Sequence, residues 1–139
     1  MQVPRGCKRG KIGDTHNNVF WDSSSNSYVG ITRVWGWDDT HWDFKRRQIG
    51  RIGTEDFRNW CNEEHQELVS LITGPTTFNK QPYSMNCFRH GDVYIGIIAV
   101  HHQELDPVWP ELAWSPDTYE RHRIAENTPL IPLSEEPLD

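Results

Sequence analysis

The sequence predicts an all-β protein built from antiparallel strands. Along residues 28–35 the side chains alternate between two faces, with Val29, Ile31 and Arg33 on one of them. A turn-forming run of Ser and Asn at 23–27 separates this segment from the short aromatic segment 18–22. Alternation flanked by turn residues is the pattern of a β-hairpin.

A second hairpin is predicted in the other half of the chain. Residues 93–101 form the most apolar segment of the sequence, and residues 83–89 precede it. Between them lies the tripeptide His90-Gly91-Asp92. A glycine there permits the positive φ angles that tight hairpin turns require.

Further strands and turns are expected around these hairpins. Residues 46–54 and 112–115 are predicted to be extended, and 54–60 is predicted to be a capped single helical turn. Residues 66–73 fit either a strand or the end of a helix, and a strand is preferred. Residues 116–121 are expected to form the counterpart of the turn at 54–60.

Composition limits the classes of function. The 139 residues carry a net charge of −6, which disfavours binding to nucleic acids and to anionic membranes. No apolar run approaches the roughly 18 residues of a membrane span, and no signal peptide is expected. The three cysteines, Cys7, Cys61 and Cys87, show no CxxC spacing. A reduced, cytoplasmic setting is therefore expected.

The two halves of the chain are related. Tyr28 and Tyr94 lie 66 positions apart, and Asp56 and Asp117 lie 61 positions apart in similar turns. Repetition of several short strands at such a period predicts β-propeller-like blades, about two four-stranded sheets. The predicted organisation is an arm (1–13), two units (14–74 and 75–133) and a tail (134–139).

A two-blade chain is smaller than a closed propeller. Closed propellers have about 4–8 blades. Two blades leave sheet faces and edges exposed, and exposed faces and edges favour association. We therefore expect the chain to associate with copies of itself or to be part of a larger protein.

Four segments of the chain resemble a known family. They are similar to the five-bladed β-propeller glycoside hydrolases of families 32 and 43 and to their uncharacterised relatives. The segments are DTHNNVFWD…YVGITRVW, IGRIGTEDFRNW, YSMNCFRHGDVYIG and PELAWSPDTYERHRI…TPLIPL. The resemblance implies a carbohydrate ligand and glycoside hydrolysis by carboxylates around a central pocket. It places a catalytic carboxylate at Asp14. The residues it implies for substrate binding are His16, Asn17, Arg33, Trp35, Tyr83 and Asn86.

The sequence also departs from the family's catalytic pattern. Gly13 and Thr15 flank Asp14 where the family has an Arg-Asp-Pro-like motif, and the region 82–86 contains no Glu for the acid. Glu104, Asp106 and Glu111 are expected in a loop near the end of a strand, where one of them is a candidate for the second carboxylate. The alternative hypothesis is a non-catalytic, self-associating interaction module.

Aromatic and metal-ligating residues leave further alternatives. Five tryptophans fit either sugar stacking or packing between sheets: Trp21, Trp35, Trp37, Trp42 and Trp109. The spacing of Cys87 with His90, and of His101 with His102, matches no established metal motif. No metal and no cofactor are expected.

Overall fold

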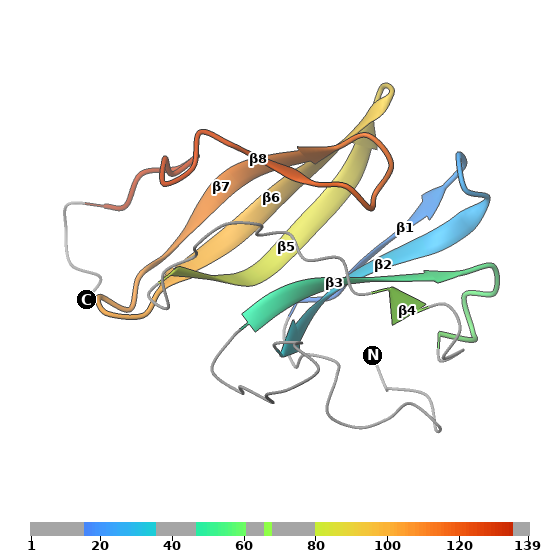
Figure 1. Ribbon diagram of the computed structural model, residues 1–139, viewed down its shortest axis with the longest axis horizontal. Helices are drawn as coiled ribbons and strands as arrows, with labels where there is room; N and C mark the ends of the chain where they lie inside the picture. The colour runs from blue at the N-terminus through green and yellow to red at the C-terminus, as the bar shows by residue number, and fades with distance from the viewer. Residues whose placement is uncertain (1–15, 36–46, 61–65, 68–79, 135–139) are drawn as a thin grey trace.

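Eight strands in two four-stranded sheets make up the regular structure in the computed structural model, which describes residues 16–35, 47–60, 66–67 and 80–134. Within each sheet, every strand pairs antiparallel with the next strand in the chain (Figure 1). The described residues contain no helix, so the all-β prediction is confirmed. The first sheet contains β1 (Asn18–Asp22), β2 (Ser27–Trp35), β3 (Arg47–Thr54) and β4 (Gln66–Glu67). The second contains β5 (Lys80–His90), β6 (Val93–His102), β7 (Val108–Ser115) and β8 (His122–Ile124).

Several predictions concern residues outside this description. Asp14, the arm 1–13, Trp37, Trp42 and Cys61 lie outside the described residues, as does most of the strand predicted at 66–73. Within the description, no helix is long and apolar enough to cross a membrane.

Both predicted hairpins form, with different turns. In the β1–β2 turn, the carboxylate of Asp22 accepts hydrogen bonds from Ser24 N at 3.1 Å and from Ser25 Oγ at 2.6 Å. Asn26 adopts a φ of 50°, which asparagine tolerates better than most residues. In the β5–β6 turn, Gly91 has a φ of 61°, where a side chain would be strained.

The two sheets pack face to face, with β5 lying across β1, β2 and β3 (Figure 1). We call the face of each sheet that meets the other sheet its inner face, and the opposite face its outer face. The buried side chains between the inner faces are mostly aliphatic: Val29, Ile31, Ile49, Met85, Cys87, Tyr94, Ile98, Val100 and Ala113. Burying such surface is the main favourable contribution to folding, at about 25 cal/mol per Å².

The strand register repeats between the sheets. Tyr28 of β2 pairs with Thr54 of β3, and Tyr94 of β6 pairs with Ser115 of β7. Aligning the two tyrosines also aligns Gly30 with Gly96. The tyrosines are therefore equivalent positions, as their spacing in the sequence predicted.

Residues that are equivalent in the two sheets lie on opposite faces: those on the outer face of the first sheet correspond to those on the inner face of the second. In the first sheet, Tyr28 and Gly30 lie on the outer face, because Val29 and Ile31 occupy the core. In the second sheet, their equivalents Tyr94 and Gly96 are the buried, inner-face residues, and Ile95 and Ile97 point outwards. The inner face of the first sheet is thus equivalent to the outer face of the second.

The turn that follows the third strand of each sheet also repeats in its hydrogen bonds. Thr54 Oγ1 accepts Asp56 N at 3.2 Å, and Asp56 Oδ1 accepts Arg58 N at 2.9 Å. In the second sheet Ser115 Oγ accepts Asp117 N at 3.3 Å, and Asp117 Oδ1 accepts Tyr119 N at 2.8 Å. The helical turn predicted for 54–60 is wrong: the side-chain acceptors hold a non-helical turn instead.

Candidate functional site

Of the residues predicted to bind substrate, the structure brings Arg33 and Tyr83 together and places Asn86 on another face. Asp14, the predicted catalytic residue, lies outside the described residues. His16 and Asn17 are exposed just before β1, and Asn17 Oδ1 accepts a hydrogen bond from Thr32 Oγ1 at 2.6 Å. The backbone of Trp35 ends β2 opposite Arg47.

Arg33 and Tyr83 do come together, at the junction of the sheets. The Arg33 guanidinium lies 4.8 Å from the centre of the Tyr83 ring, and that of Arg47 lies 5.5 Å from it. Gln81 Oε1 accepts hydrogen bonds from the backbone N and Nη1 of Arg47, both at 3.2 Å. Cation–π contacts of this kind stabilise by about 0.5–2 kcal/mol. The cluster therefore joins the sheets, with the buried Arg33 unable to present its cation to solvent.

Asn86 lies elsewhere, on the outer face of the second sheet. It pairs with Ile97 of β6, whose side chain points away from the core. Its own side chain is exposed. Asn86 therefore does not share a surface with Arg33 and Tyr83.

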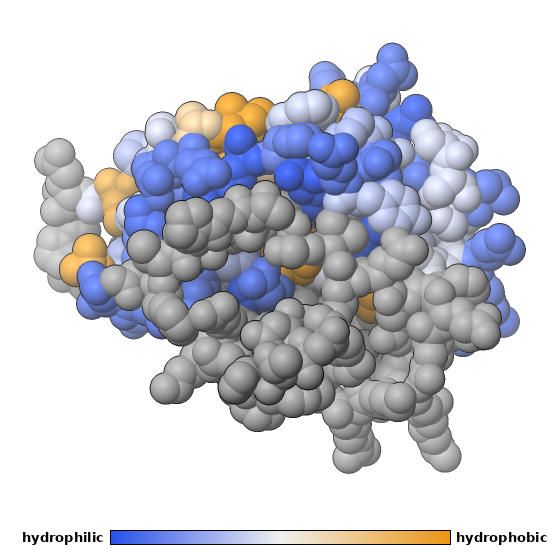
Figure 2. Space-filling model, in the orientation of Figure 1, coloured by the Kyte–Doolittle hydropathy of each residue, from blue (hydrophilic) through white to orange (hydrophobic). Residues whose placement is uncertain are grey.

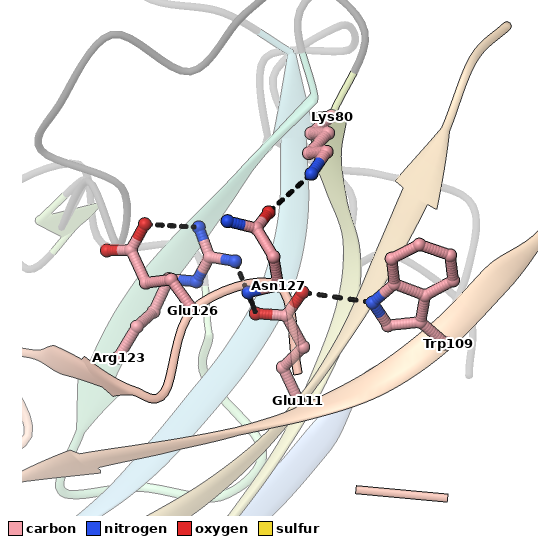
Figure 3. Close-up of polar contacts among 6 residues, drawn as sticks. All are labelled: Lys80, Trp109, Glu111, Arg123, Glu126 and Asn127. Atoms are coloured by element: carbon pink, nitrogen blue, oxygen red, sulfur yellow. Dashed lines mark hydrogen bonds and ion pairs between the residues drawn. The ribbon is translucent and has the colours of Figure 1, made fainter. Parts of the chain in front are cut away.

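Glu111 forms a buried polar cluster that the sequence did not indicate (Figure 3). The prediction of a loop at Glu111 is wrong, because this residue lies in the middle of β7 and is 0% exposed. Its Oε1 accepts Trp109 Nε1 at 3.0 Å, and its Oε2 accepts Asn127 N at 3.2 Å and Nη2 of Arg123. These donors lie in β7, in β8 and in the turn after β8, so the carboxylate holds these three segments together.

His102 adjoins this cluster. Its ring lies 3.5 Å, centre to centre, from the indole of Trp109. Burial lowers the pKa of His102, and the positive charge of Lys80 lowers it further. The imidazole is therefore held neutral at a pH where an exposed histidine would begin to take up a proton.

Asp22 is the second buried carboxylate of the described residues. Besides its turn contacts it accepts the Tyr94 hydroxyl at 2.5 Å. Burial raises the pKa of Asp22, but the hydrogen bonds from Ser25, Tyr94 and the turn outweigh it, so the pKa lies below its ordinary value. An ionised carboxylate held by donors from the turn and from the second sheet is suited to a structural role.

A recess beside Cys87 is too small for a sugar. Its volume is about 10 Å³, roughly that of one water. Burial lowers the pKa of Arg121 in its wall to about 10, and burial raises the pKa of the Cys87 thiol. A protonated, buried thiol is a poor nucleophile, so these residues form part of the core.

The described residues also contain no group of three His, Cys, Asp or Glu placed to hold a metal ion. His101 and His102 point to opposite faces of β6, as expected for neighbours in a strand. His101 Nε2 instead lies 2.8 Å from Asp106 in the following loop.

Exposed aromatic and aliphatic side chains, in contrast, gather on the two outer faces. On the first sheet, Trp21 and Phe57 lie 4.8 Å and 5.2 Å, between ring centres, from Tyr28. On the second sheet, the outer-face residues are predominantly apolar: Phe88, Ile95, Ile97, Leu112, Trp114 and Ile124. Figure 2 shows hydrophobic residues along the upper edge of the molecule, above a mostly hydrophilic front. These faces are the surfaces of the described residues best suited to binding.

Comparison with known proteins identifies no relative: no family model matches the chain, and no curated protein or solved structure is significantly similar to it. The resemblance to propeller glycoside hydrolases therefore stays a prediction.

Proposed function

We propose that this chain is a non-catalytic, self-associating module whose two propeller-like blades are completed by further copies of itself. The observation that carries the proposal is the apolar outer face of the β5–β8 sheet. Phe88 there is 47% exposed, and Ile124 is 40% exposed. Ile95, Ile97 and Leu112 between them are only half-buried.

The chemistry of this face supports a protein partner. Contiguous apolar side chains on a sheet gain about 25 cal/mol per Å² when a second surface removes them from water. Patches of this kind mark association surfaces in soluble proteins. The described carboxylates Asp22 and Glu111, in contrast, have donors from their own chain and support no acid–base pair.

Light scattering coupled to size exclusion, over a range of micromolar concentrations, tests the proposal. We expect a mass of two or more chains. Ile97→Lys puts a charge in the centre of the face and should reduce the mass to that of one chain. The matched control is Leu105→Lys, because Leu105 is 79% exposed but lies in the β6–β7 loop. A wild-type chain that remains monomeric throughout would contradict the proposal.

Carbohydrate binding is the second candidate, favoured by the exposed aromatic cluster on the first sheet. Trp21 is 47% exposed and Phe57 is 52% exposed, so about half of each residue is accessible to a sugar. Oligosaccharides of varied composition should then change the tryptophan fluorescence of the wild-type chain. The Trp21→Ala variant should lose the response, and the control Trp114→Phe should keep it.

Hydrolysis is tested separately with aryl-glycosides. The non-catalytic proposal expects no release of the aryl group above that of buffer. Hydrolysis that disappears in Asp14→Asn would overturn the proposal and favour the glycoside hydrolase prediction.

A further inference from the structure

We propose that the chain self-associates head-to-tail, with the outer face of the β5–β8 sheet packing on the outer face of the β1–β4 sheet of a second copy. The inference rests on the proposed self-association and specifies its geometry. The partner is a second copy of this chain, because the contact between the two sheets within one copy already supplies the template.

That template joins non-equivalent faces. The inner face of the first sheet packs on the inner face of the second, and these faces occupy opposite sides of equivalent blades. The outer face of the second sheet is therefore equivalent to the inner face of the first. By the same alignment, the outer face of the first sheet is equivalent to the inner face of the second. The described residues of each copy thus present one further example of each half of the interface on the outer faces.

The first contact that repeats is aromatic. Within the chain, the Phe20 ring lies 6.0 Å from the ring of Tyr94, measured between centres. The equivalents are Phe88, 68 positions after Phe20, and Tyr28, 66 positions before Tyr94. The equivalent positions thus carry the same residue types. Phe88 is exposed and Tyr28 is half-buried. Phe88 of one copy is thus placed to pack on Tyr28 of the next.

The second contact is a hydrogen bond to an edge strand. Asn18 Oδ1 accepts the backbone N–H of Cys87 at 2.9 Å. Asn86 is the equivalent of Asn18, and Val19 is the equivalent of Cys87, since Val19 pairs with Gly30 as Cys87 pairs with Gly96. Asn86 is exposed. Its amide oxygen is placed to accept the Val19 N–H of a second copy.

The third contact is polar within the chain, and both of its residues have apolar equivalents on the outer faces. Arg51 Nε donates to Thr118 Oγ1 at 2.8 Å across the internal interface. Their equivalents, at an offset of 61 positions, are Leu112 and Phe57. A polar pair inside the chain thus corresponds to an apolar pair between copies. The matched change from polar to apolar is the complementarity that a real interface requires.

A dimer that joins two copies through the second sheet alone is a poorer fit to these observations. It would bury the outer face of the second sheet against itself and leave Trp21 and Phe57 in water. A head-to-tail interface instead closes into a ring when its rotation permits. Propellers have about 4–8 blades, so a ring holds two, three or four copies of this two-blade chain.

The experiment uses one charged variant on each half of the interface. Phe88→Asp alters the second sheet, and Phe57→Asp alters the first. We expect each variant alone to be monomeric in light scattering. An equimolar mixture should give a complex with the mass of two chains, because one intact pair of faces remains. Leu105→Asp is the control and should assemble as the wild type does.

The outcomes separate this inference from the proposed function. A wild-type chain that assembles while Phe57→Asp assembles equally well would overturn the head-to-tail geometry and leave self-association intact. A mixture that stays monomeric where the wild type is fully assembled would also overturn it. A monomeric wild type would overturn both. Far-ultraviolet circular dichroism verifies folding, and Trp21→Lys replaces Phe57→Asp if the latter does not fold.

Discussion

Tyr94 donates its hydroxyl hydrogen to Oδ1 of Asp22 across 2.5 Å, and this bond joins the second sheet to the first hairpin. The same carboxylate holds the β1–β2 turn through Ser24 and Ser25. One buried anion therefore fixes both a local turn and the placement of the sheets.

Asp22→Asn should lower the free energy of unfolding at neutral pH by about 1.5–3 kcal/mol, the range for hydrogen bonds to charged groups. Tyr94→Phe should cost a similar amount, and the double variant should cost less than the sum because the two residues share one bond. Urea denaturation measures all three. Glu55→Gln, an exposed change, is the control; a loss no larger than in this control would contradict the role of Asp22.

The same carboxylate should make stability depend on pH. The pKa of Asp22 is lower in the folded chain than its ordinary value of 3.8. The unfolded chain therefore takes up this proton first on acidification, and the stabilisation is complete above pH 3.8 and is lost as the pH falls through the folded pKa. Denaturation curves across this window should show a shallower loss in Asp22→Asn than in the wild type.

Glu111→Gln should be among the most damaging single changes. It leaves the Arg123 guanidinium, 5% exposed, without its buried anion. Removing one member of a buried pair costs about 3–5 kcal/mol. Glu126→Gln is the matched control, since Glu126 contacts the same arginine at 3.5 Å but is 60% exposed. Its loss should stay below about 1 kcal/mol, and equal losses in thermal denaturation would contradict the assignment.

His102 should add a second pH dependence at milder acidity. Because its folded pKa lies below the ordinary 6.5, the unfolded chain binds the proton more readily. Stability should therefore be complete above pH 6.5 and decline as the pH falls from 6.5 to the folded pKa. His102→Phe keeps a ring against Trp109 and should remove this decline. The control variant His90→Gln changes an exposed histidine and should retain the decline in stability. If the decline is unchanged in His102→Phe, a group other than His102 causes it.

The closing turns offer a matched pair of changes. Ser115→Ala removes the acceptor of Thr118 N at 2.8 Å, where Thr118 is fully buried. An unsatisfied buried donor costs about 1–3 kcal/mol. Thr54→Val should cost about 0.5–1.5 kcal/mol, because the Asp56 N–H and the Asn59 carbonyl that it frees belong to exposed residues. Thr128→Val is the exposed control. If the slopes of the urea curves are equal, the shifts in denaturation midpoint give the loss in free energy of unfolding for each of the three variants.

The local fold was predictable where a short-range pattern determines it. Alternation along 28–35 and the glycine at position 91 predicted both hairpins, and both are present. The repeated tyrosines predicted equivalent positions that the register confirms. These features depend on side-chain period and turn chemistry, which a sequence displays directly.

The buried polar sites were not predictable, because they depend on contacts between distant parts of the chain. Asp106 and two prolines indicate a loop before Glu111, yet Pro110 lies within β7 opposite Ala99. Pairing across the sheets, as between Arg33 and Tyr83, joins residues 50 positions apart that no local pattern connects. Sequence reasoning placed these residues in strands or loops, but it lacked the packing that decides which charges are buried.

The strand order has a consequence for how the chain forms. Within each sheet, each strand pairs with the one synthesised before it, so no strand of a sheet has to wait for a distant partner. The β1–β2–β3 sheet can form before β5 leaves the ribosome. Its aliphatic inner face, with Val29, Ile31 and Ile49, then provides a surface on which β5 can pack. Local connections of this kind favour fast folding. The interval of greatest aggregation risk during synthesis is therefore the one between completion of β3 and arrival of β6.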